Sequence, residues 1–433
     1  MPLRNLAHSG RVTRPSARRR FFGVIAASVA MTVLAACGQP ETGATGDQVR
    51  NEDETQGVTD DTIKIGVFSV FSGPNALFSK AASMAIAVYE AKNAEGGING
   101  RQIEVVTADG ACDPATVQSQ LRKFIDQEQV FMIHGGSCSD VVVSNRSIIE
   151  QSGIPFLSLN ATSAAISDPP LVNLFHPKPT PDEKGTAIAE FLASNPDVQQ
   201  VGLVAAPDQL GRDVADATSE ALEAVGLEAA ADVELANEAG DATAQVQQLL
   251  RAEVDAISPT VQPQAMTSLL RDAYAQGLRV PIVTTDIARP DEQVARLSTR
   301  APAELHFGEY LFEEPISSEK YAEFRALLTE SDPELAFDAF ALEGVTSAQM
   351  NIQALEAMGD DLTWGAWIDA MEATQFDTST SGSVSFSEFD PQDPGTRRAE
   401  LAQRWAVLDP CTEGEELIVV EDWPGYSAAK EEC

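Results

Sequence analysis

The stretch from Val130 to Ser139 runs Val130-Phe131-Met132-Ile133-His134-Gly135-Gly136-Ser137-Cys138-Ser139. Its first half is short and apolar, which is typical of a buried strand, and its two glycines indicate a turn directly after that strand. Hydroxyl and backbone N–H groups at such a strand end lie at the mouth of a sheet, where small anions such as carboxylates bind. We therefore predict an anion site at Ser139.

Similar apolar runs recur along the chain and alternate with stretches of helical periodicity. This alternation occurs in two series of about 100 residues each, which predicts two parallel-sheet lobes. The prolines of Pro177–Pro181 would interrupt either kind of element and mark the boundary between the series. Strands are expected at 63–68, 103–106, in the first part of 130–137 ahead of its glycine turn, and at 154–157 in the first series, and at 201–204, near 233, at 256–258 and at 282–283 in the second.

The predicted fold class is α/β, with two doubly wound, Rossmann-like lobes that each hold a central parallel sheet and are joined by a hinge. Residues 317–375 are mostly helical in pattern, whereas Val384–Phe386 and Ala406–Leu408 resemble late strands that return to the lobes. Several crossings between lobes would suit a hinge. The expected boundaries are 62–180 plus about 308–380 for the first lobe and 181–307 plus about 381–433 for the second.

The N-terminus has the features of an export signal. Residues 1–36 carry several arginines and no acid, and they end in an apolar stretch. The end of this stretch and the residue after it, Leu34-Ala35-Ala36-Cys37, resemble a bacterial lipobox, in which the cysteine is lipidated. We expect a signal peptide at 1–36, a flexible tether at 37–61, and a lipid anchor on the outer face of the cytoplasmic membrane. An ordinary signal peptide or a short membrane anchor is the alternative, and the Sec or twin-arginine route stays open.

Charge and cysteine content restrict the possible partners. The chain has 66 acidic and 29 basic residues, a net charge of −37, which disfavours nucleic acid and anionic lipid surfaces. Beyond Cys37 an even set of cysteines in an exported chain suggests two disulfides. Three connectivities are possible, and the sequence-local one is the simplest. A metal site lacks support from any Cys-x-x-Cys or clustered histidines. The local pairs are Cys112 with Cys138 and Cys411 with Cys433.

Five short segments occur in a fixed order along the chain: Ser72-Gly73-Pro74, Ala94–Gly100, Ala111–Pro114, Gly136–Ser139 and Asn160–Thr162. In this order they resemble the leucine/isoleucine/valine-binding proteins of bacterial ABC importers, which are type I periplasmic solute-binding proteins. The resemblance implies a monomer whose two lobes close on an amino acid and deliver it to ABC permease subunits, with no cofactor and no enzymatic activity.

The resemblance also implies contacts from the first lobe. Ser139 would receive the ligand carboxylate, together with the Thr162 hydroxyl and the backbone around Asn160 and Ala161. Phe78 would form an aromatic wall. Each position has a structural alternative as well. Ser139 could be a helix N-cap, Thr162 could cap the turn at Ala164–Ile166, and Phe78 could lie in the core.

The second lobe departs from the family pattern. Leu210 and Gln262 stand where the leucine-type binders carry tyrosines, so the branched-chain specificity is in doubt. Asp286 matches the acidic residue that pairs with the ligand ammonium, with a turn residue as the alternative. Asp140 would repel an anion if it faced the cleft.

An exported hydrolase is the rival from another functional class. The chain has no Gly-x-Ser-x-Gly elbow, no His-Glu-x-x-His and no phosphate loop. Beyond the signal its histidines are His134, expected in the core, His176, at the hinge, and His306. A ligand sensor that presents its closed state to a membrane receptor is a second alternative, because its binding step would be identical.

Overall fold

A computed structural model describes residues 51–72, 76–285, 305–309, 318–333, 335, 337–399, 404–408, 417–420, 422, 424 and 427–428. Every described residue belongs to one compact unit, Asp47–Cys433. Several predicted features fall outside the described residues. They are the signal peptide at 1–36, the lipidated Cys37, Asp286 and the pair Cys411 and Cys433.

The first lobe is built on a parallel sheet of five described strands in the order β2-β1-β3-β4-β5. Its strands other than the edge strand β2 are almost fully buried because helices cover the sheet, as expected for a parallel sheet, whereas β2 is partly exposed. The strands are β1 (Thr62–Ser69), β2 (Gln102–Asp109), β3 (Met132–Gly135), β4 (Phe156–Ser158) and β5 (Leu174–Phe175). Their helices are η1 (Ala76–Phe78), α1 (Ser79–Ala94), α2 (Pro114–Arg122), η2 (Lys123–Glu128), α3 (Ser139–Ser152) and η3 (Ala164–Ile166).

The second lobe contains a sheet of seven described strands in the order β14-β13-β10-β9-β8-β6-β7. Strands β6 to β10 run parallel, and β13 and β14 extend the edge in antiparallel fashion. The strands are β6 (Gln200–Ala205), β7 (Glu228–Glu234), β8 (Ala256–Thr260), β9 (Ile282–Thr285), β10 (Leu305–Glu309), β13 (Arg404–Leu408) and β14 (Leu417–Val420). The helices are α4 (Pro181–Ala193), α5 (Gln209–Val225), α6 (Thr243–Arg251) and α7 (Pro263–Gln276). The predicted two-lobed α/β class is confirmed.

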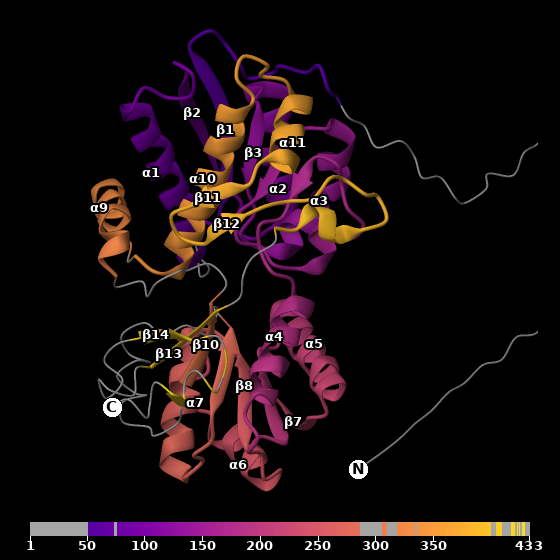
Figure 1. Cartoon of the computed structure of the whole chain (residues 1–433), viewed down its shortest axis with the longest axis vertical. Coiled ribbons are helices and arrows are strands. Elements are labelled where there is room, and N and C mark those ends of the chain that lie inside the picture. The colour runs from indigo at the N-terminus through magenta and orange to yellow at the C-terminus, as the bar shows by residue number, and fades with distance from the viewer. Residues whose placement is uncertain are drawn as a thin grey trace, which may run out of the picture. The chain divides into compact units, whose positions relative to one another are not determined.

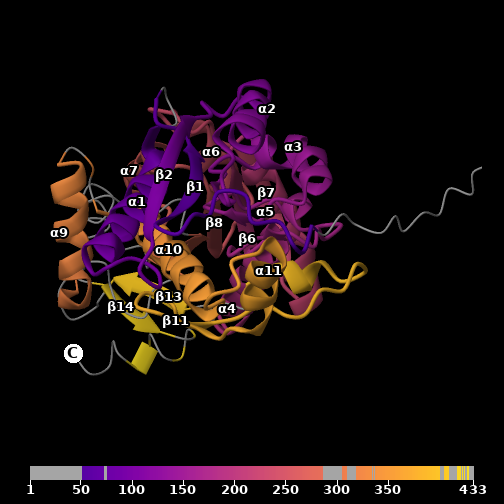
Figure 2. The same ribbon diagram turned by 90° about the horizontal axis from the view of Figure 1, so that it is seen from above.

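Helices from the last third of the chain return to the first lobe. Helix α10 (Ala339–Ala357) lies against α1, and α11 (Trp364–Ala373) packs into the same core (Figures 1 and 2). Phe386 and Ala399 also belong to this core, so we propose that the chain crosses to the second lobe after Ala399 and not near residue 381. The other elements are η5 (Glu319–Tyr321), α9 (Ala322–Ser331), β11 (Phe376–Thr378), β12 (Gly382–Val384) and η6 (Pro394–Arg397).

We propose that the tether, expected through residue 61, ends before residue 51. Residues 51–61 hydrogen-bond to the first lobe. Their carbonyls accept from the backbone N–H groups at the start of helix α11, which have no partner within that helix. Trp364 N donates to Glu54 O over 2.9 Å, and Gly365 N donates to Glu52 O over 3.1 Å. No helix in the described residues is both long and apolar enough to cross a bilayer.

The described crossing between the lobes runs from β5 to α4. His176 N donates to Arg397 O over 2.9 Å, which ties the start of the crossing to η6 in the first lobe. Thr180 then begins α4 with a capping box, in which Thr180 and Glu183 satisfy each other's backbone N–H groups. Both ends of the crossing are therefore anchored, and Lys178 between them lines the cavity described below.

Candidate ligand-binding cleft

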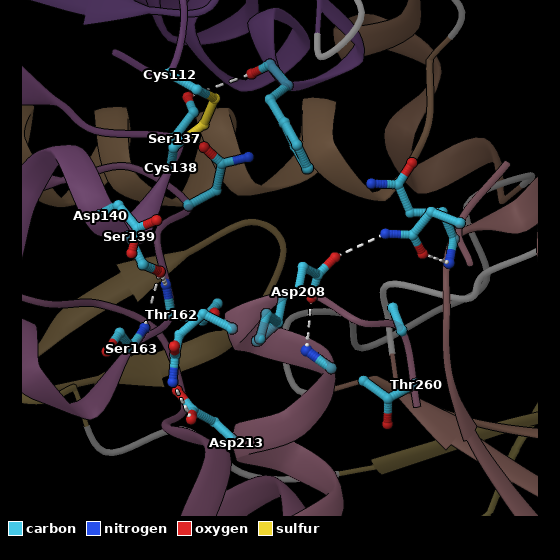
Figure 3. Close-up of a pocket in the computed structure, with 18 of the residues that line it drawn as sticks. Cys112, Ser137, Cys138, Ser139, Asp140, Thr162, Ser163, Asp208, Asp213 and Thr260 are labelled. Carbon is cyan, nitrogen blue, oxygen red and sulfur yellow. Dashed lines mark hydrogen bonds between the residues drawn. A yellow bond between two sulfur atoms is a disulfide. The ribbon is translucent and has the colours of Figure 1, made fainter. Parts of the chain in front are cut away.

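A cavity of about 260 Å³ is lined by loops from both lobes (Figure 3). These loops follow the carboxyl ends of the strands, where open α/β sheets bind their ligands. The cavity brings together most of the binding residues predicted from the sequence, while Ala161 lies just behind its wall and Asp286 is outside the described residues. The predicted residues that line it are Phe78, Ser139, Asn160, Thr162, Leu210 and Gln262.

Ser139 is the first residue of α3 and follows the turn after β3. The N-cap is Cys138, so the alternative that Ser139 caps the helix is wrong. The Ser139 Oγ accepts hydrogen bonds from Thr162 N and Ser163 N, each over 3.1 Å (Figure 3). A serine oxygen has two lone pairs and one O–H, so both acceptor positions are used and only the donor is left for another partner.

The loop at 160–163 is held by backbone bonds within the first lobe. Asn160 N and Ala161 N donate to Gly136 O, and Thr162 N donates to Ser139, so these groups already have partners. Ser163 and not Thr162 precedes η3, so the alternative that Thr162 caps this turn is also wrong. Thr162 instead lines the cavity and is 5% exposed.

Asn160 has an unusual environment. Its side chain is 7% exposed, and both its Oδ1 and its Nδ2 are buried without a hydrogen-bond partner among the described residues. Buried amides nearly always have partners, because an unsatisfied polar group costs about 1–3 kcal/mol. Asn160 is also one of the residues that line the cavity.

One wall of the cavity is apolar. The rings of Phe78 and Phe340 meet edge to face with their centroids 5.3 Å apart, and the disulfide between Cys112 and Cys138 lines the same cavity. The predicted local pairing is thereby confirmed for this bridge, whose Cα atoms are 5.6 Å apart. Phe78 forms part of the wall and is half-buried. Sequence reasoning missed Phe340, which approaches Phe78 from a helix more than 250 residues away.

The wall from the second lobe is built on two helix N-termini. Asp208 caps α5 by accepting from Gly211 N over 2.8 Å, and it also accepts from Asn237 Nδ2 over 2.7 Å. The Oδ1 of Asn237 in turn accepts from Gln262 N over 2.9 Å, at the start of α7. Asn237 therefore holds the loop of Leu210 and the loop of Gln262 in a fixed relation.

Charged side chains around the cavity are mostly acidic. Lys178 and Glu343 form an ion pair with Nζ and Oε1 2.5 Å apart, each side chain 2% exposed. Asp140 and Asp208 line the cavity while exposed to solvent, which answers the question of whether Asp140 faces the cleft. Asp213 is half-buried, and its pKa is raised, chiefly by burial and also by nearby carboxylates.

Sequence reasoning missed Lys178, Glu343, Asp208 and Asp213. The position of Asp208 before a helix was the available signal, since an N-cap at the carboxyl end of a strand lies at the site. The pairing of Lys178 with Glu343 spans 165 residues and has no local signal. Among the described residues, no group of His, Cys, Asp or Glu could hold a metal ion.

The described histidine side chains are structural. His134, expected in the core, is fully buried, and its Nδ1 lies 2.8 Å from the Tyr89 hydroxyl. The Nε2–H of His176 donates to Ala161 O over 2.7 Å, which supports the loop of Asn160 and Thr162 from behind. Burial lowers the pKa of both rings to about 3. The side chain of His306 lies outside the described residues.

A family model described as periplasmic binding protein matches residues 62–403, which include the first lobe and the second lobe up to β10. The chain belongs to this family. The resemblance seen in the sequence and the predicted fold class are both confirmed.

Relatives of known name are distant. An "Amino acid binding protein" of Pseudomonas aeruginosa is 26% identical over 235 residues, which cover 53% of this chain and 62% of that protein. A "Leu/Ile/Val-binding protein homolog 2" of Brucella abortus is 26% identical over 303 residues, which cover 69% of this chain and 79% of that protein. The chain thus spans less than two thirds of the first relative's length.

Solved structures of low identity share the fold. The branched-chain amino acid transporter substrate-binding protein of Streptococcus pneumoniae, in complex with isoleucine, has a TM-score of 0.68 at 21% identity and covers 83% of this chain and 100% of its own. A solute-binding protein of Rhodopseudomonas palustris, in complex with 4-hydroxybenzoate, has a TM-score of 0.68 at 19% identity. The match covers 85% of this chain and 99% of that protein.

Proposed function

We propose that this protein captures a small carboxylate-bearing solute, an amino acid or a close relative, between its lobes and delivers it to the permease of an ABC importer. The observation that carries the proposal is the state of Ser139. Its oxygen accepts two backbone hydrogen bonds, so the hydroxyl offers the cavity a donor and nothing else. A donor at the N-terminus of α3 suits an anionic oxygen, because the helix dipole favours negative charge there.

The relatives support a carboxylate. Isoleucine and 4-hydroxybenzoate, the ligands in two solved structures of the same fold, both carry this group, although they differ in everything else. Their shared feature therefore matches the part of the cavity that follows the family pattern. The second-lobe wall, with Leu210 and Gln262, would then choose among the remaining parts of the solute.

Capture would follow from contacts to both lobes. A ligand held by Ser139 and by the loops of α5 and α7 binds the closed form more tightly than the open form, and this difference in affinity drives closure. The residues proposed to contact it are Phe78, Ser139, Asn160, Ala161, Thr162, Leu210, Gln262 and Asp286.

The deciding experiment is mass analysis of solute that co-purifies with the protein, followed by thermal shift with a panel of amino acids, short amides and organic anions. We expect one class to raise the melting temperature, and Ser139→Ala with Thr162→Ala to abolish that rise. Ser147→Ala is the matched control, since Ser147 lies on α3 but is exposed and away from the cavity. No shift across the panel would refute the amino-acid assignment, and turnover of any member would favour an enzyme.

We also propose that the protein is anchored in the cell envelope by lipid at Cys37. The lipobox-like Leu34-Ala35-Ala36-Cys37 supports this anchor. Replacing Cys37 by alanine should shift the protein from the membrane fraction to the soluble extracytoplasmic fraction. An unchanged membrane fraction would contradict lipid anchoring at this residue.

A further inference from the structure

The charges that line the cavity do not balance. Lys178 and Glu343 neutralise each other, which leaves the carboxylates of Asp140, Asp208 and Asp213. Their hydrogen-bond donors are neutral: Asn237 and a backbone N–H for Asp208, and Gln209 for Asp213. Among the described residues that line the cavity, no cation other than Lys178 is present.

Asp213 differs from the many acids that merely face solvent. It is half-buried on α5, and it lines both this cavity and an adjoining cavity of about 540 Å³. The adjoining cavity is also acidic, since Asp140 of the first lobe lines it together with Asp182, Asp216 and Glu220 of the second. Closure around a neutral solute would bring these like charges together and remove water from them, which opposes closure.

Asn160 provides an independent indication of what enters. Its amide is buried and lacks partners on both atoms, so it can accept from a ligand N–H and donate to a ligand oxygen at once. A purely aliphatic side chain beside it would leave the amide unsatisfied. The ring pair of Phe78 and Phe340 lines the same cavity and can hold a methylene stem, and the ring faces attract a cation.

We propose that the cavity selects a solute with a cationic group in addition to its α-ammonium, that is, a basic amino acid or a compound of the same charge pattern. The inference rests on the proposed function, because Ser139 is still taken to hold the carboxylate. A neutral zwitterion leaves the net charge of the cavity unchanged, whereas a basic amino acid adds one positive charge. An organic cation fits better than a metal ion, since the described acids do not form a metal-binding group.

Arginine and citrulline test the charge with almost no change of shape. By calorimetric titration, we expect the protein to bind arginine or lysine at least about tenfold more tightly than citrulline or leucine, as for a charge-assisted hydrogen bond. Asp213→Asn should weaken arginine binding about tenfold and leave citrulline binding unchanged. Glu223→Gln is the matched control, because it removes the same charge from an exposed position of α5 outside both cavities.

Asn160→Ala adds a second test that does not depend on Asp213. The substitution should weaken the binding of arginine without a matching loss of stability, measured as the melting temperature of the free protein. The reason is that the Asn160 amide makes no hydrogen bond among the described residues. Citrulline or leucine binding as tightly as arginine would overturn the inference while the proposed function stands. Failure of every amino acid to bind would overturn both.

Discussion

At the scale of single residues, His176 links the lobe crossing to the ligand loop. Its Nε2–H holds Ala161 O, between Asn160 and Thr162, and its backbone bonds to Arg397 and Ala399 of the first lobe. The residue touches no part of the cavity itself, so its role would be to position the loop. Loss of the ring should therefore change the affinity and not the kind of ligand.

The buried ring of His176 predicts a pH dependence of stability. Its pKa falls from 6.5 to about 3, first because of burial and also because Arg398, Lys178 and Lys184 lie nearby. Between these values the unfolded chain binds a proton that the folded chain does not, so the free energy of unfolding falls as pH drops, by up to about 1.4 kcal/mol per pH unit.

The measurement is urea unfolding of the parent and of His176→Gln between about pH 6.5 and about pH 4. The glutamine keeps an N–H for Ala161 O but does not titrate, so the variant should lose less stability on acidification than the parent. His176→Phe also removes the titrating ring, but phenylalanine cannot donate a hydrogen bond to Ala161 O. Comparing it with His176→Gln separates the effect of titration from the effect of the hydrogen bond. Equal pH slopes for all three proteins would contradict a neutral buried His176.

At the scale of elements, a chain of buried hydrogen bonds joins the helices of the first lobe to β3. Trp367 Nε1 donates to Asn351 Oδ1, and Asn351 Nδ2 donates to the Tyr89 oxygen, each over 2.9 Å. The Tyr89 hydroxyl then donates to His134 Nδ1, 2.8 Å away. Burial also raises the pKa of Tyr89, which keeps its proton. The strand that leads to Ser139 is thereby tied to α1, α10 and α11.

Tyr89→Phe should destabilise the protein by about 1–3 kcal/mol, because it leaves the buried His134 and Asn351 without their shared partner. Urea unfolding measures this loss. Tyr274→Phe is the control for the same chemical change, since Tyr274 is 47% exposed, and it should change the free energy of unfolding by less than about 0.5 kcal/mol. Equal effects of the two substitutions would show that the buried network adds no stability.

The contact between α1 and α10 depends on a glycine. A Cβ on Gly344 would lie 2.1 Å from Ala81 O, so any side chain there would force the helices apart. Gly344→Ala should destabilise the protein by about 1–3 kcal/mol or more in urea unfolding. Gly240→Ala serves as control, because a Cβ there meets nothing within 4 Å. An unchanged stability for Gly344→Ala would mean that the helix pair yields without cost.

The two series of strands were predictable because apolar runs and turn residues are local signals. Local signals also pointed to Ser139, which lies close after β3, whereas Thr162 was proposed from the resemblance to the family. The charged residues that line the cavity were not predictable in this way. Asp213 reaches the cavity through the packing of α5, and Lys178 is held there by an ion pair with Glu343 in a distant helix. The return of Phe386 to the first core likewise depends on tertiary packing that a short apolar run does not specify.

At the scale of the whole molecule, acidic repulsion should oppose the compact state. The net charge of −37 is spread over the chain, and carboxylates from both lobes meet at the adjoining cavity. Salt screens such repulsion, since the Debye length falls from about 10 Å at 0.1 M to about 3 Å at 1 M. Added salt should therefore stabilise this protein even without ligand, unlike a protein held together mainly by exposed ion pairs.

The melting temperature of the ligand-free protein should rise steadily as sodium chloride increases from about 0.05 to about 0.5 M, over which screening changes most. Sucrose of equal osmolality is the control, because it stabilises by exclusion from the surface and leaves the charges unscreened. Asp213→Asn should reduce the salt response more than Glu223→Gln does, if the carboxylates between the lobes contribute beyond the overall charge. A melting temperature that is flat or falls with salt would mean that the acidic residues of this chain are already compensated in the folded state.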